Sequence, residues 1–280
     1  MIRHAVTLVI FLAACGGPDD PSIDRSATPL RPAVTTPTQQ PIGGDWRARV
    51  AADISDLRTS APALHAELTA LGPSRTRAGI LRITSTPSAD PRATSVFLDR
   101  LARGDGSAAE RAAYAEVLAR TTGTYADALV DLFAAEREVA VRAAYVHTVR
   151  RVTTDHAVTV LQRGLVDPSA EVQAEAARVA GGHPAGTRVA AELRGALVSS
   201  APEVRSEAAR ALGILGVDTA RGELLARLGD GAPEVRLEAL RALDRIAPGS
   251  VDAAKLSTLA RDTDERISRL AVKLADTAVR

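Results

Sequence analysis

The chain has 280 residues, with 35 Lys and Arg against 34 Asp and Glu, and a single cysteine. Aromatic residues make up only 2% of it although 46% is hydrophobic, so any core must consist of Ala, Leu and Val. Such small side chains suit packed helices better than a β-sandwich, which favours β-branched and aromatic residues at alternating positions. The near-zero net charge provides no basic face, and we therefore expect no nucleic-acid partner.

The first fifteen residues have the pattern of a processing signal. Arg3 precedes an apolar run over residues 5–12, which is too short to cross a bilayer as a mature helix. The sequence Leu-Ala-Ala-Cys follows and ends at Cys15, before two glycines. This resembles the lipobox of bacterial lipoproteins, which implies a signal peptide over 1–14 and lipidation of Cys15. The alternative is an ordinary secretory signal cleaved after an alanine.

Removal of residues 1–14 takes away Arg3 and no acidic residue, which leaves 34 basic and 34 acidic residues. The mature chain would then have no cysteine for a disulfide in an oxidising compartment. The resemblance implies a location at the bacterial cell envelope, on the periplasmic side of either membrane or at the cell surface. Membrane contact would be through the lipid alone.

Residues 15–45 have the composition of a tether. Six prolines lie between positions 16 and 44 among Ser, Thr, Gln, Asp and Gly, without apolar periodicity. Such a stretch cannot bury enough surface to offset its ordering entropy, so we expect a disordered spacer.

An internal repeat of about 31 residues runs through the second half of the chain. Its aligned aliphatic positions are separated by 31, 32, 31 and 32 residues. They are Val141, Val172, Val204, Val235 and Ile267.

Each repeated run has the pattern of a helix. Further apolar residues follow the aligned position by four, five and eight residues, which places them on one helical face. Pro202 and Pro233 stand where a first helical turn tolerates a missing N–H. Gly213 and Gly216 are expected to end their helix. A second amphipathic stretch precedes or follows each run, such as 219–228 and 251–260, so the unit is a pair of antiparallel helices.

These features resemble HEAT repeats, and more closely the short HEAT-like repeats of phycobilisome lyases. The resemblance rests on Asp167, Asp230 and Asp262 before the helices, on the Val-Arg pairs at 141–142, 204–205 and 235–236, and on the strings EAARAL and EALRAL. It implies an all-α, right-handed α-solenoid of stacked antiparallel helix pairs over 46–280. The repeats are divergent over 46–105 and regular over 106–280.

No pattern of catalytic residues or metal ligands stands out. The histidines have no i, i+4 ligand spacing, and we expect them at the surface or in ordinary packing. There is no Gly-x-Ser-x-Gly elbow and no Gly-rich phosphate loop. We therefore predict no catalytic residue, no metal and no cofactor.

Three aromatic residues leave alternatives open. Tyr114 and Tyr145 share one repeat position, where they are either anchors on a binding face or core residues that replace the alanines of later repeats. We favour the core. Trp46 is expected to pack in the first helix at the end of the stack; the alternative is a ligand-facing position.

Three Glu-x-x-Arg pairs are expected to form a charged stripe on the concave face. They are candidates for contact with a protein or peptide, or else an ordinary solvated helix face. Their members are Glu175, Arg178, Glu207, Arg210, Glu238 and Arg241.

A ladder between repeats is also predicted. When the arginine position of each repeat is paired with the acid position of the next repeat, every charge meets its opposite. Gln173, a neutral residue at the arginine position, then meets Ser199, a neutral residue at the acid position. The predicted rungs are Arg111–Glu136, Arg142–Asp167, Gln173–Ser199, Arg205–Asp230 and Arg236–Asp262.

The sequence thus favours a non-catalytic protein–protein interaction scaffold at the envelope, with an unknown protein or peptide partner. The alternatives are a lyase-like or modifying enzyme whose site is spread across repeats, and a purely structural envelope component.

Overall fold

The computed structural model describes residues 45–70, 90–118 and 125–278. The signal peptide, Cys15 and the tether lie outside these ranges and stay predictions. The described residues contain helices and turns but no strand. The helices are α1 (Trp46–Ser60), α2 (Pro62–Thr69), α4 (Ala93–Arg103), α5 (Ala108–Leu118), α6 (Ala126–Ala135), α7 (Val139–Thr148), α8 (Asp155–Leu165), α9 (Ala170–Gly181), α10 (Ala190–Ala196), α11 (Pro202–Leu215), α12 (Arg221–Arg227), α13 (Pro233–Ile246), α14 (Ala253–Leu259) and α15 (Glu265–Ala278).

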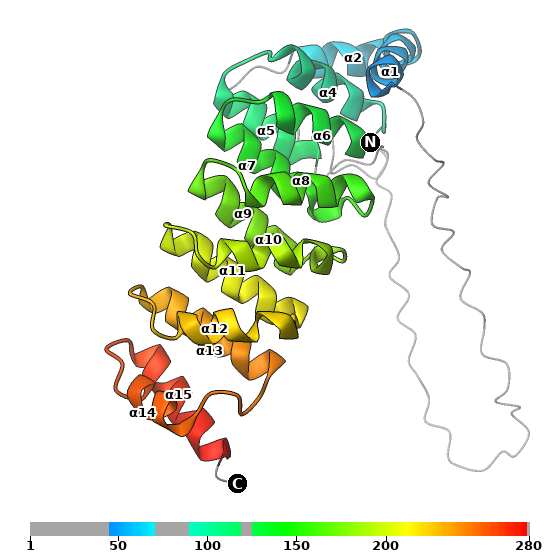
Figure 1. The fold of residues 1–280 in the computed structure, drawn as a ribbon. Helices are drawn as coiled ribbons and strands as arrows, with labels where there is room; N and C mark the ends of the chain where they lie inside the picture. Colours follow the sequence, from blue (N-terminus) through cyan, green and yellow to red (C-terminus); the bar gives the residue numbers. More distant parts are fainter. Residues whose placement is uncertain (1–44, 71–89, 119–124, 279–280) are drawn as a thin grey trace, which may run out of the picture. The chain divides into compact units, whose positions relative to one another are not determined.

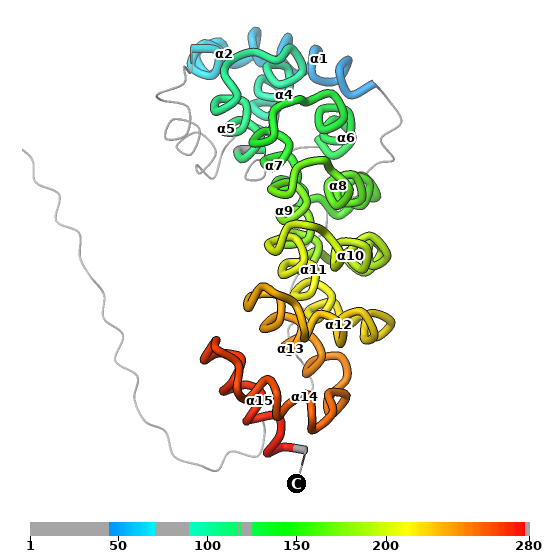
Figure 2. The backbone as a smooth tube through the Cα atoms, turned by 60° about the vertical axis from the view of Figure 1, so that its left-hand side comes forward, coloured from blue at the N-terminus to red at the C-terminus, as the bar shows by residue number. Residues whose placement is uncertain are grey.

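From α5 onward, the helices stack in two layers (Figure 1). Helices α5, α7, α9, α11, α13 and α15 pack in succession against one another and form one layer, while α6, α8, α10, α12 and α14 lie on the other side. The stack bends toward the first layer, whose helices line the inner side of the curve in Figure 2. This arrangement is the predicted all-α solenoid of antiparallel helix pairs.

The aligned aliphatic positions form the centre of the core. Val141, Val172, Val204, Val235 and Ile267 are all completely buried. Neighbouring repeats bury these residues together, because one helix pair alone cannot cover its apolar face.

Tyr114 and Tyr145 are core residues, as favoured from the sequence. Both are buried, and the ring of Tyr114 stacks on Phe97 of α4 with 5.7 Å between centroids. The corresponding position in later repeats is an alanine that is fully buried in each case. These alanines are Ala176, Ala208, Ala239 and Ala271.

The prediction for Gly213 was wrong. Gly216 does end α11, with a φ of 67° that glycine adopts without strain. Gly213, however, lies inside the helix and packs against Ala242 of α13. Glycine is needed there because the two helices approach too closely to leave room for a Cβ.

Trp46 packs at the N-terminal end of the described solenoid, as expected. Its side chain is only 5% exposed, and Nε1 donates a hydrogen bond to Asp131 on α6 at 2.8 Å. The Arg47 guanidinium lies 4.4 Å from the Trp46 ring centroid, a cation–π distance. An ion pair between Arg49 and Asp127, at 2.6 Å, also joins α1 to α6.

Candidate binding groove and inter-repeat ladder

All four predicted charged rungs of the ladder are present. Each arginine uses Nε and Nη2 to bind both oxygens of the carboxylate in the next repeat's turn. The Nε–oxygen distances are 3.1 Å for Arg111–Glu136 and 2.8 Å for Arg142–Asp167, Arg205–Asp230 and Arg236–Asp262.

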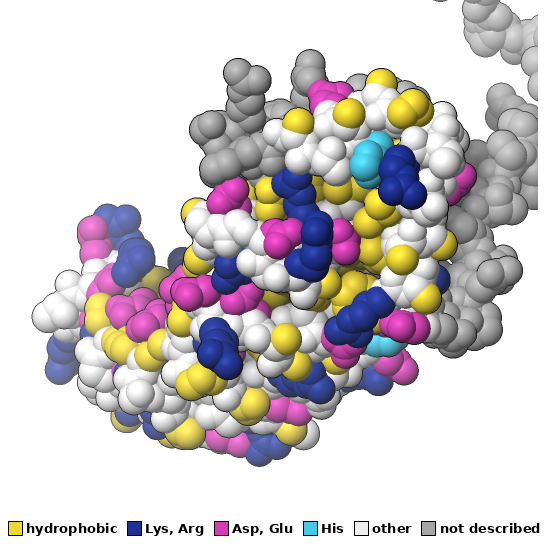
Figure 3. Space-filling view, turned by 90° about the horizontal axis from the view of Figure 1, so that it is seen from above, with side chains coloured by type: hydrophobic (Ala, Val, Ile, Leu, Met, Phe, Trp, Pro, Cys, Tyr) yellow, Lys and Arg dark blue, Asp and Glu magenta, His cyan; other side chains and the backbone are white. Residues whose placement is uncertain are grey.

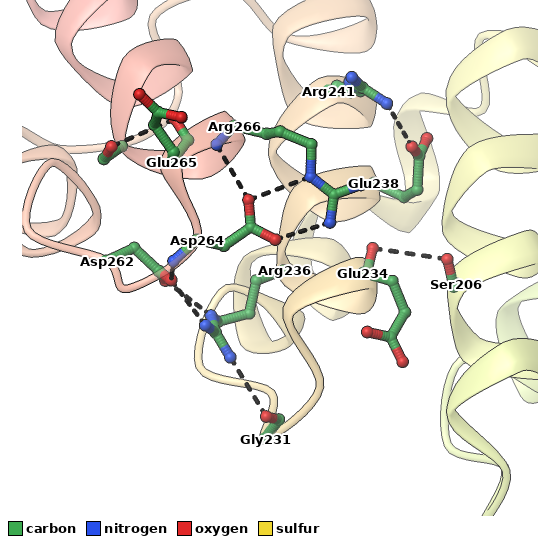
Figure 4. A network of polar contacts seen from close by, with 11 residues as sticks. Ser206, Gly231, Glu234, Arg236, Glu238, Arg241, Asp262, Asp264, Glu265 and Arg266 are labelled. Atoms are coloured by element: carbon green, nitrogen blue, oxygen red, sulfur yellow. Dashed lines mark hydrogen bonds and ion pairs between the residues drawn. The ribbon is translucent and has the colours of Figure 1, made fainter.

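The remaining arginine nitrogen reaches back to the arginine's own repeat. Nη1 of Arg236 donates to the carbonyl oxygens of Asp230 at 2.9 Å and Gly231 at 3.2 Å, while its other nitrogens hold Asp262 (Figure 4). Arg205 makes the same contacts to Ser199 and Ser200. One guanidinium therefore ties two successive turns together, a contact that the sequence did not predict.

The acids in turn accept backbone hydrogen bonds. Oδ1 of Asp230 accepts from the amide of Ala232 at 3.0 Å, and Oδ1 of Asp262 accepts from Asp264 at 2.9 Å. These bonds fix the turn that precedes each first-layer helix. The acidic residue therefore shapes its own turn and receives the neighbouring arginine.

Burial and pairing shift the pKa of three ladder acids, Glu136, Asp230 and Asp262. The Arg205 guanidinium lowers the pKa of Asp230, and Arg236 lowers the pKa of Asp262. Burial by itself would raise the pKa of Glu136, but hydrogen bonds from Arg111 and from turn amides outweigh it and lower that pKa. These carboxyls are held in the charged form.

The fifth rung is neutral and looser. Oγ of Ser199 lies 3.5 Å from Oε1 of Gln173, the outer limit of a hydrogen bond. Nε2 of Gln173 donates to the carbonyl of Asp167 at 2.6 Å, the contact that arginine makes in the other repeats. The predicted neighbours meet, but without a charged pair.

The outer layer carries a smaller set of inter-repeat contacts that the sequence analysis missed. Gln162 of α8 donates to Glu192 of α10 at 2.9 Å, and Nε of Arg194 donates to Glu223 of α12 at 2.8 Å. The pattern was available in the sequence as residues about 30 positions apart on the second helices.

The three Glu-x-x-Arg pairs form ion pairs within their own helices. The Arg Nε donates to the Glu carboxylate at 2.9 Å in Arg178–Glu175 and in Arg210–Glu207, and Nη1 of Arg241 donates to Glu238 at 2.6 Å. Each pair lies on a first-layer helix, α9, α11 or α13, on the inner side of the curve.

A groove of about 740 Å³ crosses α5, α7, α9 and α11 on this side. It is lined by small side chains and by carboxylates. The alanines are Ala112, Ala140, Ala143, Ala144 and Ala174, and the acids are Glu116, Glu171, Glu175, Glu203 and Glu207, joined by His147 and Arg178. Seen from above, the solenoid shows acidic groups beside basic ones with hydrophobic side chains between them (Figure 3).

The three Glu-x-x-Arg pairs each hold one acid and one base, but further acids lie beside them. Glu171, Glu203 and Glu234 occupy one repeat position, directly before the aligned valine, and they form a second acidic column beside the Glu-x-x-Arg pairs. All three are exposed, and within the described part of the chain their carboxylates form no hydrogen bond or ion pair. Arg178 is itself held by Glu175. The groove therefore has an acidic excess.

The described histidines have different surroundings. His147 lines the groove, with Nδ1 3.0 Å from Glu175 Oε1 and 3.3 Å from Arg178 Nη2. His183 is buried, and its Nε2 lies 2.7 Å from the Val152 carbonyl oxygen while Nδ1 accepts from the Ala185 amide. Across the described ranges, no three His, Cys, Asp or Glu side chains come together as a metal site. None of the helices described is long and apolar enough to span a membrane.

Part of the chain matches a known protein family. The family model of HEAT repeats matches residues 161–230 and 190–275. Residues 161–275 are HEAT repeats. The matched segment contains three rungs of the ladder and much of the groove wall. No curated protein sequence matches the chain.

Several solved structures are similar to the HEAT-repeat solenoid. A designed armadillo repeat protein in complex with the peptide (KR)4 is 20% identical, with a TM-score of 0.46 over 72% of this chain and 98% of that one. Human deoxyhypusine hydroxylase in complex with glycerol is 18% identical, with a TM-score of 0.35 over 83% of this chain and 96% of that one. The complex of CpcE and CpcF of phycocyanin lyase from Nostoc sp. PCC7120 is 18% identical, with a TM-score of 0.34 over 90% and 99%. At these scores neither enzyme's activity is transferred to this chain.

Proposed function

We propose that this protein is a non-catalytic binding scaffold whose concave groove holds an extended, basic segment of a partner protein. The observation that carries the proposal is the groove itself, which is lined by alanines and glutamates and crosses four successive first-layer helices. A peptide chain in extended conformation advances about 3.3 Å per residue, so a segment of about ten residues would cross neighbouring repeats.

The charges favour Lys or Arg in that segment. Glu171 and Glu203 are exposed and form no ion pair with any residue that the structure describes, so a cation that approaches them displaces none of the described ion pairs. The small side chains of Ala140 and Ala174 leave room for backbone and for the aliphatic stems of Lys or Arg. An acidic ligand would meet repulsion from the same walls.

Binding of a fluorescein-labelled peptide of alternating Arg and Ala, followed by anisotropy, tests the groove. We expect saturable binding that weakens with added salt, because exposed charge pairs are screened. The Glu171→Gln/Glu203→Gln variant should bind about tenfold more weakly, since each exposed pair contributes up to about 1 kcal/mol.

The matched control is Asp155→Asn/Glu192→Gln, which removes the same net charge from the outer layer. It should change the affinity less than twofold. Equal losses in the two variants would mean that the peptide responds to overall charge and that the groove is not the site.

We further propose that lipidation of Cys15 anchors the scaffold in a bacterial envelope membrane. The support is the sequence Leu-Ala-Ala-Cys after a short apolar run. Cys15→Ser should abolish incorporation of labelled fatty acid and leave the unprocessed precursor. A wild-type protein that takes up no label and fractionates as soluble would contradict the anchor.

A further inference from the structure

The joint between α9 and α11 differs from its neighbours at the ladder. Across it, Gln173 and Ser199 share one contact of 3.5 Å. Across the next joint, between α11 and α13, Arg205 and Asp230 share two charge-assisted bonds of 2.8 and 2.7 Å. The bidentate pair fixes both the distance and the angle between adjacent turns, whereas the neutral contact fixes neither.

The two turns are otherwise matched, which isolates the effect of the rung. One has the sequence Ser-Ser-Ala-Pro over 199–202 and the other Asp-Gly-Ala-Pro over 230–233. In both, the third residue's amide donates to the first residue's side chain, at 3.3 Å for Ala201 and 3.0 Å for Ala232. The turns thus share a geometry and differ in the acceptor's charge.

Further contacts also cross the α9–α11 joint, and they include a close packing contact and an outer-layer hydrogen bond. Gly181 packs on Ala211, where an added Cβ would lie 3.0 Å from the Ala211 Cα. On the outer layer, Gln162 donates to Glu192, and this bond is exposed. The apolar Gly–Ala contact holds the helices together but does not lock their orientation, so it can act as a pivot.

We propose that the α9–α11 joint is a flexible joint of the solenoid, about which the repeats on its two sides turn relative to each other. The groove crosses this joint, because Glu171 and Glu175 belong to α9 while Glu203 and Glu207 belong to α11. A turn at the joint therefore changes the groove's width. Adjustment to a bound peptide rests on the function proposed above, whereas the flexibility itself does not.

Hydrogen exchange of the full-length chain, without any peptide, tests the joint. After correction for intrinsic rates, amides in the turn and first helical turn over 199–205 should be about tenfold less protected than those over 230–236. Equal or greater protection over 199–205 would overturn the proposal.

Two variants exchange the rungs. Gln173→Arg/Ser199→Asp installs a charged rung at the α9–α11 joint and should raise protection over 199–205 about tenfold, while each single change should not. Arg205→Gln/Asp230→Ser makes the next rung neutral and should lower protection over 230–236 to the level of the natural neutral joint. If Gln173→Arg/Ser199→Asp leaves the protection over 199–205 unchanged while circular dichroism shows full helicity, the rung does not control the joint.

If the Gln173→Arg/Ser199→Asp variant does not fold, the Arg205→Gln/Asp230→Ser variant tests the proposal in its place. Anisotropy with the Arg-Ala peptide separates this inference from the proposed function. Loss of protection at the neutral joint together with no peptide binding supports the joint and overturns the groove proposal.

Discussion

Gly213 of α11 lies so close to Ala242 of α13 that a Cβ built on the glycine would be 2.7 Å from both the Cα and the Cβ of Ala242. Gly181 occupies the same position one repeat earlier and meets Ala211 in the same way. Because backbone atoms take part in the contact, rotation of a side chain cannot relieve a clash. Glycine at this position sets how closely successive helices stack.

Gly213→Ala should therefore destabilise the solenoid by about 1–3 kcal/mol, as overpacking of a core does, although alanine favours helix more than glycine. Urea unfolding measures the change. Gly195→Ala is the control, since nothing lies within 4 Å of its added Cβ on helix α10. That variant should be neutral or more stable by up to about 1 kcal/mol. A stabilised Gly213→Ala would show that the helices have room to separate.

The sequence was sufficient to predict the ladder but not the role of Gly213, for a physical reason. A rung joins two positions that are separated by a fixed number of residues. Gln173 stands where the other rungs have arginine and Ser199 where they have an acid, and matching these two neutral residues selected one pairing of the repeats. By contrast, the sequence pattern of a glycine near the end of a helix is the same whether the glycine ends the helix or lets the neighbouring helix pack closely against it. Only the packing of α11 on α13 distinguishes the two.

The acidic walls of the groove were missed for a related reason. Glu171 and Glu203 of the groove, and Glu234 at the same position one repeat later, lie in the first turn of their helices, where acids are common because they favour the positive end of the helix dipole. Their alignment becomes a surface property only when the repeats stack. The Trp46–Asp131 hydrogen bond spans 85 residues and could not be inferred, since the repeat pattern fades before position 105.

Asp230→Asn tests the ladder through pH. Because the pKa of Asp230 is lowered in the folded state, its charge stabilises the fold above the unfolded pKa of about 3.9, and that contribution is lost as the pH falls through the folded value. The variant should lose about 1–3 kcal/mol at pH 7 and approach the wild type in stability as the pH falls well below 3.9. Unfolding free energies measured across this range provide the comparison.

The control for Asp230 is Asp155→Asn, which breaks an exposed ion pair with Arg188. It should leave the free energy of unfolding at pH 7 almost unchanged, because solvent screens an ion pair between exposed side chains. A constant deficit for Asp230→Asn at every pH would show that the carboxylate's charge contributes nothing and that only its shape matters.

His183→Leu tests a buried hydrogen-bonded link between repeats. Nδ1 accepts from the Ala185 amide, so the ring proton is assigned to Nε2, which donates to the carbonyl of Val152. Leucine fills similar space but leaves that amide and that carbonyl unpaired, at a cost of about 2–4 kcal/mol. Thermal or urea unfolding detects it. His156→Leu is the control and should cost less than about 1 kcal/mol, because among the described residues the His156 ring has a hydrogen-bond contact only with the side chain of Thr154.

Val204→Asp tests whether stability comes from stacking between repeats. The side chain is completely buried in α11, which packs against both α9 and α13. A carboxylate there would have no partner and would cost several kcal/mol, enough to separate the repeats on either side of α11. We expect a much lower urea midpoint together with a broader or two-step transition, since each side retains its own neighbouring repeats.

Glu203→Asp, one residue earlier and exposed, is the matched control and should shift stability by no more than about 0.5 kcal/mol. A similarly small effect at Val204 would mean that the α9, α11 and α13 layer does not bury this position. Because the same position holds Val141, Val172, Val235 and Ile267, each also fully buried, that result would contradict the repeat register of the whole solenoid.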